Sequence, residues 1–342
     1  MEDKLKSAEQ WYDNNMKTYG KFSSEVAQII EKILKSKNVP YHSITYRVKD
    51  RESYLNKCKK NKYLNPAEEI MDVSGIRIIA YTNNDVKNIC EIIEKEFEID
   101  SNNSGNKMDK MDENMVGYLS VHYIAKLNDI RAKLTENSIY GNCKCEIQIR
   151  TLLQHAWAEI EHDKNYKFSG VLPKDIRRRF YLVSGVLEMM DREFDVLSEE
   201  IDKYSKEVKE KTKVNDFDIE INTESLSQYM SSKFRNNKCI RNVVTKSVIK
   251  ELNAFGFQKI QDIDQKLTEE ISKILLHEVG EMTYTGLLRD LMILLDAEKY
   301  FMTSYQHKWA VMESEDVVRW EKMGVKNIRE YLKEFNVAII KK

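Results

Sequence analysis

The chain has 342 residues, of which 42% are hydrophobic and 32% charged, and its 55 basic and 56 acidic residues leave a formal net charge of −1. Because positive and negative charges are almost equal in number, the chain as a whole has no general electrostatic attraction to nucleic acids or membrane surfaces. An anionic ligand must therefore be bound by a local cluster of cations. With 3 prolines and 11 glycines the composition is typical of an ordered, helix-rich protein, and the length suits two domains.

The sequence carries no membrane or secretion signal that we recognise. No apolar run reaches the roughly 18 residues of a membrane span, and the segment "MEDKLKSAEQWYDNN" has no apolar core of a signal peptide. We therefore expect a cytoplasmic protein without membrane contact. Its five cysteines lack further ligands at metal-binding spacing, so we expect free thiols, including the pair Cys143 and Cys145 that shares one face of a predicted strand.

The first half of the chain changes from helical to alternating periodicity. Apolar residues at helical spacing predict one or two helices within an N-terminal segment, 1–40. Over 41–170, strands are predicted at "YHSITYRVK", "GIRIIAY", "GYLSVHYIAKL" and "CKCEIQIRT". Between and after them, helices are predicted at "RESYLNKCKK", at "NNDVKNICEIIEKEF" with an Asn/Asp cap, and at "LLQHAWAEIEHDKNY". The order predicts a mixed β-sheet flanked by helices, with the polar segment "SNNSGNKMDKMDENMV" as a loop beside the site.

The second half of the chain is predicted to be helical. Pro173 begins a long amphipathic helix that becomes more charged toward its end, and we interpret 171–214 as a linker. Residues 215–342 have helix-type periodicity, without an internal repeat or a known catalytic signature, and predict a mainly helical domain. Two roles stay open for it: a regulatory domain that covers a nucleotide cleft, or a module for oligomerisation or stability.

Three predicted strands carry chemically specific side chains on one face. A half-exposed sheet would explain any one of them, but a solvated face usually shows interchangeable Lys, Glu and Thr rather than a single Tyr, His and Gln. The three strands together therefore favour a binding face. The alternation groups Thr45, Arg47 and Lys49, then Tyr118, Ser120 and His122, then Glu146, Gln148 and Arg150.

Cations gather near the first two strands and predict a polyphosphate site. The lysines that follow Lys57 also fit a solvated basic helix, but a charge on a strand is costly to bury unless it meets an anion. Polyphosphates usually arrive with Mg²⁺, which takes carboxylate oxygens, and Asp72 and Glu146 are the candidates. By itself, Asp72 before Gly75 would also be ordinary turn chemistry. Within 31 residues the cluster contains Arg47, Lys49, Ser53, Lys57 and Arg77.

Several other catalytic motifs are missing from the sequence. No Gly-rich phosphate loop and no protein-kinase signature is present, so side-chain cations must bind any phosphates. His155, Glu159 and His162 share a helix face, but their spacing matches no diagnostic metal motif. We expect them to brace Glu146 and the bound phosphates. The pair His162–Asp163 lacks the further ligands of a metal-dependent phosphohydrolase.

Four separated motifs resemble the RelA/SpoT alarmone synthetase family. "YRVKDRESYLNK", "MDVSGIR", "GYLSVHY" and "EIQIRTLLQHAWAEIEHDKNYK" occur in the family's order and spacing, and the resemblance covers roughly 20–170, with related helical sequence to about 205. Within that family, the chain is similar to the small, single-synthetase type without a hydrolase domain. The resemblance implies a nucleotidyltransferase-like sheet, a homo-oligomer, and Mg²⁺-dependent transfer of the β,γ-diphosphate of ATP to the 3′-hydroxyl of GMP, GDP or GTP in the stringent response.

The resemblance also implies roles for individual residues. Asp72 resembles the principal Mg²⁺ ligand, and Glu146 resembles the acid that completes the metal shell or accepts the proton of the attacking hydroxyl. Tyr118 is similar to the ring that stacks on the acceptor base. The ATP side is implied for Arg47, Lys49, Ser53, Lys57 and Arg77, and the acceptor side for Tyr118, His122, Gln148 and Arg150.

One departure from the family pattern leaves the acceptor open. Members that use GTP well commonly have Lys and Asn before the Gly-Tyr pair, whereas here "MDENMVGY" places Val116 at the Asn position. One alternative is an acceptor with fewer 5′-phosphates, and another is a toxic relative that diphosphorylates the 3′ end of tRNA, with the C-terminal domain as autoinhibitor. A third is an inactive sensor on the same fold, against which the intact Asp72, Glu146 and Arg77 argue.

Overall fold

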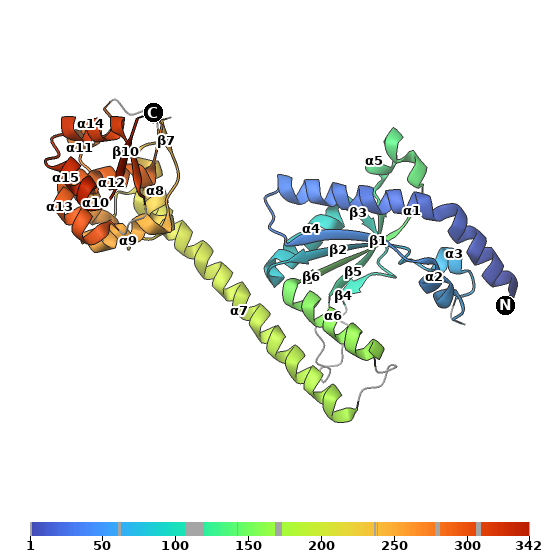
Figure 1. The fold of residues 1–342 in the computed structure, drawn as a ribbon. Helices are drawn as coiled ribbons and strands as arrows, with labels where there is room; N and C mark the ends of the chain where they lie inside the picture. Colours follow the sequence, from blue (N-terminus) through green and yellow to red (C-terminus); the bar gives the residue numbers. More distant parts are fainter. Residues whose placement is uncertain are drawn as a thin grey trace. The chain divides into compact units, whose positions relative to one another are not determined.

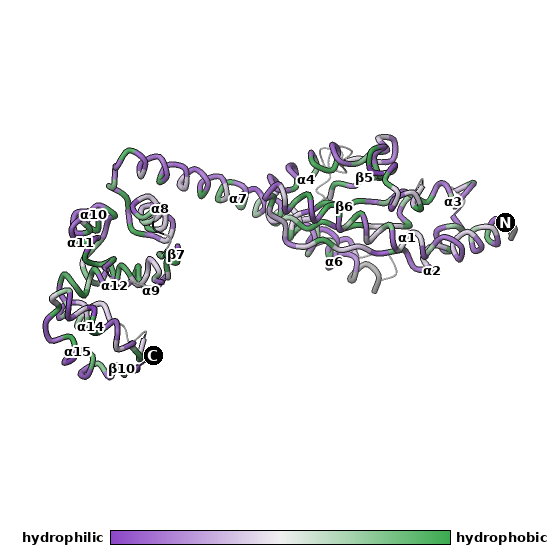
Figure 2. Tube along the Cα trace, turned by 90° about the horizontal axis from the view of Figure 1, so that it is seen from above, coloured by the Kyte–Doolittle hydropathy of each residue, from purple (hydrophilic) through white to green (hydrophobic). Residues whose placement is uncertain are grey.

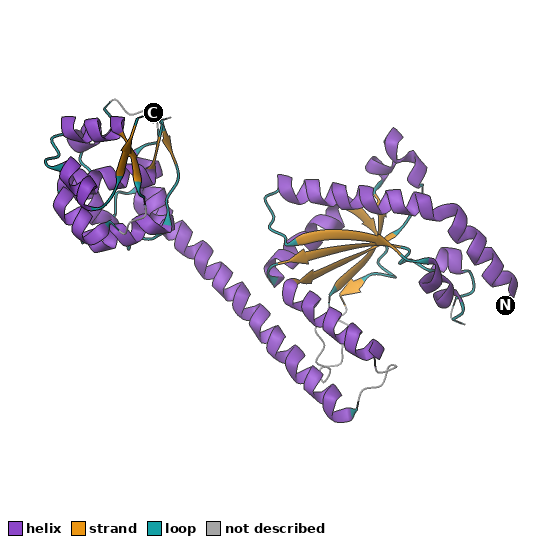
Figure 3. Cartoon of the chain, viewed as in Figure 1, coloured by secondary structure: helices purple, strands orange, loops and turns teal. Residues whose placement is uncertain are grey.

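The computed structural model describes residues 2–60, 63–106, 120–141, 143–167, 173–235, 237, 239–277, 281–305 and 309–341. Within it the chain forms two compact units, Met1–Ser198 and Glu199–Lys342, and the boundary between them falls inside the long helix α7 (Lys174–Lys213) (Figures 1 and 3). None of the helices described is long and apolar enough to cross a membrane.

The first unit is built on a mixed sheet, as the sequence predicts. Strands β2 and β6 are parallel and central, and the other neighbours pair antiparallel. The order is β1-β2-β6-β5-β3, with β4 paired to β5. The strands are β1 (Ser43–Val48), β2 (Ser74–Ala80), β3 (Phe97–Ile99), β4 (Gly105–Asn106), β5 (Val121–Leu127) and β6 (Cys145–Thr151).

The helices of the first unit flank this sheet. The N-terminal region, for which one or two helices were predicted, is one continuous helix. The short elements α3, α5 and η2 had no sequence signal that we recognised. The helices are α1 (Glu2–Ser36), α2 (Arg51–Cys58), α3 (Pro66–Glu69), α4 (Asn83–Glu96), α5 (Asp129–Ala132), the 3₁₀ helix η2 (Thr135–Tyr140) and α6 (Leu152–Lys167).

Helix α4 has a different cap from the one predicted. Its cap is Thr82, whose hydroxyl accepts a hydrogen bond from the Asp85 backbone N–H at 3.1 Å, while the Asp85 carboxylate accepts from the Thr82 N–H at 3.2 Å. The expected Asn/Asp cap was wrong because this reciprocal pair satisfies the helix start one residue earlier.

The two faces of the sheet have different partners. Helices α1 and α4 pack on the apolar face, where Ile76, Ile78, Ile147 and Ile149 are buried in one core (Figure 1). Helix α6 directly follows β6 and, together with polar side chains of the sheet, lines a pocket on the other face. The polar face is therefore open to a ligand between the sheet and α6.

The long helix α7 (Lys174–Lys213) is anchored to the sheet by two acids one turn apart. The Asp191 carboxylate accepts a hydrogen bond from the Thr151 hydroxyl at 2.6 Å, at the end of β6. The Asp195 carboxylate accepts from the Asn83 side chain at 2.9 Å and from the Asn84 N–H at 3.0 Å, at the start of α4. Anionic groups are favourable at that position because of the helix dipole.

The second unit is mainly helical, as predicted, but it also has two short strand pairs. Strand β7 pairs with β8, and β9 with β10, both parallel. Its elements are α8 (Thr223–Lys233), β7 (Ile240–Arg241), α9 (Lys246–Phe255), α10 (Ile260–Lys266), α11 (Glu269–Leu275), β8 (Met282–Thr283), α12 (Tyr284–Leu295), α13 (Ala297–Lys299), the π-helix η3 (Tyr300–Ser304), β9 (Val311–Glu313), α14 (Ser314–Lys322), α15 (Ile328–Glu334) and β10 (Ala338–Ile340).

Two helices of this unit end in the same way. Gly256 follows α9 with φ +103°, and Gly324 follows α14 with φ +92°, a backbone region that favours glycine. The next backbone N–H then bonds back to the helix, from Phe257 to the Leu252 carbonyl at 2.9 Å and from Val325 to the Trp320 carbonyl at 3.0 Å. The sequence alone did not reveal this repeated turn.

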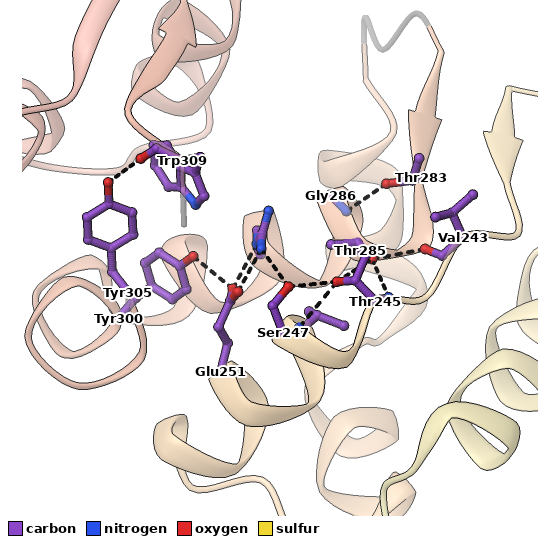
Figure 4. A network of polar contacts seen from close by, with 12 residues as sticks. Val243, Thr245, Ser247, Glu251, Thr283, Thr285, Gly286, Tyr300, Tyr305 and Trp309 are labelled. Atoms are coloured by element: carbon purple, nitrogen blue, oxygen red, sulfur yellow. Dashed lines mark hydrogen bonds and ion pairs between the residues drawn. The ribbon is translucent and has the colours of Figure 1, made fainter. Parts of the chain in front are cut away.

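A buried polar network joins α9, α12 and η3 (Figure 4). The Glu251 carboxylate is 1% exposed and accepts two hydrogen bonds from the Arg289 guanidinium, at 2.6 and 2.8 Å, and one from the Tyr300 hydroxyl at 3.1 Å. The Arg289 guanidinium also donates to the Ser247 hydroxyl at 3.3 Å. Because every contact lies within the second unit, this network contributes to the stability of that unit.

Candidate active site

The polar face predicted from three strands forms a row across four. In the strand register, Thr45 lies opposite Arg77, Arg77 opposite Gln148, and Gln148 opposite His122. Directly paired residues point to the same face of a sheet, so side chains that are far apart in the sequence become neighbours here. This row brings the predicted ATP-side and acceptor-side residues together.

Two adjoining pockets open on this face, with volumes of about 110 and 360 Å³. Arg47, Arg77 and Gln148 line both of them. Two ligands bound side by side would therefore share one wall that carries two guanidinium groups. The first pocket is also lined by Thr45, Tyr46, Asp72, Gly75, Ile76 and Glu146, and the second by Ser120, His122, Arg150, Ala158, Glu159, Glu161 and His162.

Asp72 lies just before β2 and faces two ammonium groups. Its Oδ2 accepts a hydrogen bond from Lys57 Nζ at 2.7 Å and lies 3.1 Å from Lys49 Nζ. Among the contacts of the described residues, its buried Oδ1 has no hydrogen-bond partner. A buried carboxylate oxygen without a donor is costly in an apolar site and is available to a cation.

The pKa values of Asp72 and Lys57 shift in the directions expected of an ion pair. Burial raises the pKa of Asp72, but Lys57 and Lys49 lower it by more, so the carboxyl group titrates below its ordinary range. Burial lowers the pKa of Lys57, and the hydrogen bond and charge of Asp72 more than offset this. Both groups are thus charged at neutral pH.

The Glu146 carboxylate is held from both sides. Its Oε1 contacts His122 Nδ1 at 2.8 Å, and its Oε2 accepts a hydrogen bond from Gln148 Nε2 at 2.9 Å. The other ring nitrogen of His122 lies 2.6 Å from the Ser120 hydroxyl oxygen. Contacts on both oxygens fix the orientation of this carboxylate in the first pocket.

Arg150 completes this chain of contacts from the interior. It is 6% exposed, and its Nη2 donates to Gln148 Oε1 at 2.7 Å, which directs the Gln148 amide N–H toward Glu146. Burial, assisted by the nearby charge of Arg77, lowers the pKa of the Arg150 guanidinium to about 10. Arg150 therefore supports the site through Gln148 and remains a cation at neutral pH.

Helix α6 contacts the site through Arg77. Arg77 Nη1 donates to Glu159 Oε1 at 2.9 Å, and His155 Nδ1 lies 3.6 Å from the same oxygen. Burial lowers the pKa of His155, with further contributions from Arg150 and Arg77, which favours a neutral ring. The sequence predicts that this helix face braces Glu146. Among the described contacts its Glu159 pairs with Arg77, whereas His122 and Gln148 contact Glu146.

Some predicted residues lie differently from what the strand pattern suggested. Arg47 is exposed, so the cost of burial that we assigned to it was wrong. Lys49 follows the end of β1, and its N–H bonds to the Val73 carbonyl at 2.8 Å. Ser53 is exposed on α2, where its N–H donates to the capping Asp50 at 2.8 Å, and it is not among the described residues that line the pockets. Tyr118, like Val116, lies outside the described residues.

The sequence interpretation missed Tyr46. The alternation placed this ring on the apolar side of β1, but it is 52% exposed and lines the first pocket. Because β1 is an edge strand, its side chains can be reached from the open edge. A large aromatic residue directly beside the cations Arg47 and Lys49 was the signal available in the sequence.

The donor set suits a magnesium ion. Asp72 and Glu146 line the same pocket and supply only oxygen atoms, which is the ligand type that Mg²⁺ prefers. The buried Oδ1 of Asp72, which has no hydrogen-bond partner among the described residues, points to the same use. Within the part of the chain that the structure describes, no group of three or more His, Cys, Asp or Glu residues could hold a metal. A metal here would depend on two carboxylates, with substrate or water oxygens as further ligands.

Comparisons with known proteins place this site in a family. Residues 46–171 match the model described as "Region found in RelA / SpoT proteins". GTP pyrophosphokinase YjbM of Bacillus subtilis is 30% identical over 166 residues, which cover 47% of this chain and 74% of that protein. The chain belongs to the RelA/SpoT family. GTP pyrophosphokinase YwaC of the same organism is 26% identical to this RelA/SpoT protein over 167 residues, 48% of this chain and 76% of that relative.

Solved structures similar to this RelA/SpoT protein include small alarmone synthetases. Small alarmone synthetase 1 from Bacillus subtilis matches with a TM-score of 0.48 and 25% identity, over 56% of this chain and 98% of that one. The same protein bound to its product pppGpp matches with a TM-score of 0.47 and 26% identity over the same shares. Small alarmone synthetase 2 matches with a TM-score of 0.46 and 25% identity, over 55% of this chain and 98% of that one.

Proposed function

We propose that this RelA/SpoT protein transfers the β,γ-diphosphate of ATP to the 3′-hydroxyl of a guanine nucleotide. The observation that carries the proposal is the first pocket, in which Asp72 and Glu146 lie beside Arg47 and Arg77. Two carboxylates and two guanidinium groups are what a polyphosphate with its cation requires. The curated relatives named GTP pyrophosphokinases support the same activity.

ATP would occupy the first pocket. Arg47 and Arg77 supply charges that can form bidentate contacts with phosphate oxygens. Lys49 and Lys57 add positive charge beside Asp72. A phosphate would compete with Glu159 for Arg77, and this exchange is inexpensive because the Glu159 side chain is 56% exposed. Ser53 stays part of the proposed ATP side from family resemblance alone.

Mg²⁺ would be held by Asp72 and Glu146. When bound, the ion neutralises charge on the phosphates and withdraws electron density from the phosphorus that is attacked. The two lysines bonded to Oδ2 orient the Asp72 carboxylate, so that Oδ1 faces away from them. The protein's own contribution is therefore a prearranged carboxylate pair in a cationic pocket.

The acceptor nucleotide would occupy the second pocket. Its 3′-oxygen attacks the β-phosphorus of ATP, the bond between that phosphorus and the α,β-bridging oxygen breaks, and AMP leaves. Glu146 is the base that we assign to the hydroxyl proton, because His122 and Gln148 fix its orientation. His122, Gln148 and Arg150 line the acceptor side, and Tyr118 is proposed from the family resemblance to stack on the base.

The identity of residue 116, a valine, is the reason to consider a second candidate acceptor. The missing Asn there weakens the argument for a free guanine nucleotide and favours, as the alternative, the 3′ end of tRNA. Both acceptors present a ribose hydroxyl, so the chemistry proposed for Glu146 is the same. The difference would lie in the partner that reaches the second pocket.

One labelling experiment separates these possibilities. The purified chain is incubated with Mg²⁺, ATP labelled at the γ-phosphate, and GMP, GDP, GTP or deacylated tRNA. We expect label in a guanine nucleotide, with AMP formed in equal amount and much slower transfer by Asp72→Asn. Label in tRNA alone would replace the first proposal with the second. No transfer to any of the four acceptors would refute both and favour the inactive sensor.

A further inference from the structure

The second unit has two adjoining pockets of its own, with volumes of about 790 and 420 Å³. Lys273 on α11 lines both of them, and we call the two together the basic groove. In Figure 2 hydrophobic positions follow one another along α12, whereas hydrophilic positions are frequent on α11. The basic residues that line the groove are Lys233, Arg235, Lys273, His277, Arg319 and Lys322.

The positive charge of the basic groove is local. Over 199–342 the chain carries 24 basic and 25 acidic residues, so the second unit as a whole is nearly neutral. Among the described residues that line the groove, by contrast, five are lysine or arginine and Glu269 is the single acid. Such a local excess of cations is what a site for an anion requires.

Part of this charge has a structural role. Lys233 Nζ lies 2.6 Å from Asp264 Oδ1, and Arg319 Nη2 lies 2.5 Å from Asp290 Oδ2. Both cations also lie in the last turn of a helix, α8 and α14, where a positive charge stabilises the C-terminal end. The positions of Lys233 and Arg319 are therefore explained without a ligand.

Arg235 and Lys273 differ from these two cations. Both are exposed, and neither has an ion-pair partner within the part of the chain that the structure describes. Arg235 lies beyond the end of α8, so stabilisation of that helix end does not explain it. Lys273 lies in the last turn of α11 but also lines both pockets. Two uncompensated cations from different elements thus line the larger pocket.

Uncharged hydrogen-bond donors complete the larger pocket. The Ser272 hydroxyl is buried and has no hydrogen-bond partner among the described residues, which is costly unless a ligand supplies an acceptor. Ser232 adds a second hydroxyl to the lining. Asn237 Oδ1 accepts a hydrogen bond from the Cys239 N–H at 3.0 Å, so the amide nitrogen of Asn237 remains as a donor. The pocket therefore offers donors of three kinds to one acceptor-rich group.

The size of the pocket and its donors indicate a small phosphorylated ligand. A volume of about 790 Å³ lies within the range of small-molecule sites, roughly 300–1,000 Å³. Phosphate oxygens accept hydrogen bonds from guanidinium, ammonium and hydroxyl groups alike. A nucleic acid or an acidic protein would instead need cations spread over an interface of about 1,000 Å² or more.

We propose that the larger pocket binds a phosphorylated small molecule, with a phosphate group between Arg235 and Lys273 that accepts a hydrogen bond from Ser272. Phe234 and Leu276 give the wall an apolar part, against which a nucleoside would pack. Free polyphosphate and nucleotides share the phosphate chemistry of this site. The proposal is independent of the reaction at the nucleotide pockets, because every residue involved belongs to the second unit.

Isothermal titration calorimetry of the full chain tests the site. The probes are inorganic tripolyphosphate and ADP, and the background is Arg47→Gln/Arg77→Gln, which removes the phosphate contacts proposed in the first unit. In this background at least one probe should bind at one site per chain. Adding Arg235→Gln/Lys273→Gln should weaken this binding by about 100-fold, the effect of losing two charge-assisted contacts. Tighter binding of ADP would identify a nucleotide as the ligand, and equal or tighter binding of tripolyphosphate would identify free polyphosphate.

Lys266→Gln/Lys326→Gln is the matched control in the same background. Both lysines are exposed in the second unit and are not among the described residues that line the groove, so the control removes the same charge away from the pocket. Circular dichroism checks that each variant is folded. Binding of neither probe, binding that survives Arg235→Gln/Lys273→Gln, or an equal loss in the control would refute the proposal.

Discussion

Lys57 Nζ and Asp72 Oδ2 lie 2.7 Å apart, which joins α2 to the segment before β2. Lys49 Nζ lies 3.1 Å from the same oxygen, so two cations neutralise one side of the carboxylate. The other oxygen, Oδ1, is buried and has no hydrogen-bond partner within the described part of the chain. This asymmetry is the physical basis for assigning a cation to Asp72.

Asp72→Asn should abolish most of the diphosphate transfer without unfolding the protein. The amide keeps the shape but loses the charge that a divalent cation needs, and we expect kcat to fall by about 10²–10³-fold. Initial rates with labelled ATP measure this, and circular dichroism checks the fold. Asp129→Asn, an exposed acid at the start of α5, is the control. Near-normal turnover in Asp72→Asn would return this residue to a turn role.

Lys57→Met should weaken ATP binding more than acceptor binding. One charge-assisted contact is worth about 1.5–3 kcal/mol, so we expect the KM for ATP to rise by about 10–100-fold. Steady-state kinetics with each substrate varied in turn measure the change. Lys59→Met, the next exposed lysine beyond α2, should leave both KM values unchanged. A rise confined to the KM of the acceptor would contradict the ATP-side assignment.

Gln148→Leu should lower both kcat and stability. The substitution removes the hydrogen bond to Glu146 and leaves the buried Arg150 guanidinium without this acceptor. An unsatisfied buried charged group costs about 2 kcal/mol or more in the free energy of unfolding. Urea denaturation measures the loss, and Gln28→Leu on the exposed side of α1 is the control. Unchanged stability would show that Arg150 finds another acceptor.

Removal of Mg²⁺ should stop the reaction and leave the fold intact. Lys49 and Lys57 already compensate one oxygen of Asp72, so the folded state does not depend on the ion. EDTA should reduce transfer to background, and excess Mg²⁺ should restore it. The far-ultraviolet circular dichroism spectrum should be the same in both conditions. Transfer that continues at full rate in EDTA would exclude the proposed role of the carboxylate pair.

Glu251→Gln should destabilise the second unit. The partly buried Arg289 would lose its anionic partner, and breaking one side of a buried ion pair costs about 3–5 kcal/mol. Thermal and urea unfolding measure this effect. Glu334→Gln, on the exposed side of α15, is the matched control and should have a negligible effect. Equal stability of the two variants would mean that the network in Figure 4 contributes little.

Local patterns in the sequence predicted the mixed sheet, its main helices and the helical C-terminal region. Alternating periodicity identifies a strand because successive side chains point to opposite faces, and this needs no knowledge of the neighbouring strand. Short elements such as β7 and β8 were not predicted, because a strand of two residues is too short to show a periodicity.

The sequence by itself determined which chemistry-bearing side chains share a face of a strand, and its cluster of cations and acids supplied the candidates Asp72, Glu146 and the surrounding cations. Only the tertiary structure decided their partners. Glu159 reaches Arg77 across 82 positions of sequence, and His122 reaches Glu146 across 24. Such contacts depend on strand order and register, which the packing of the whole sheet fixes. The periodicity of a single segment carries no information about them.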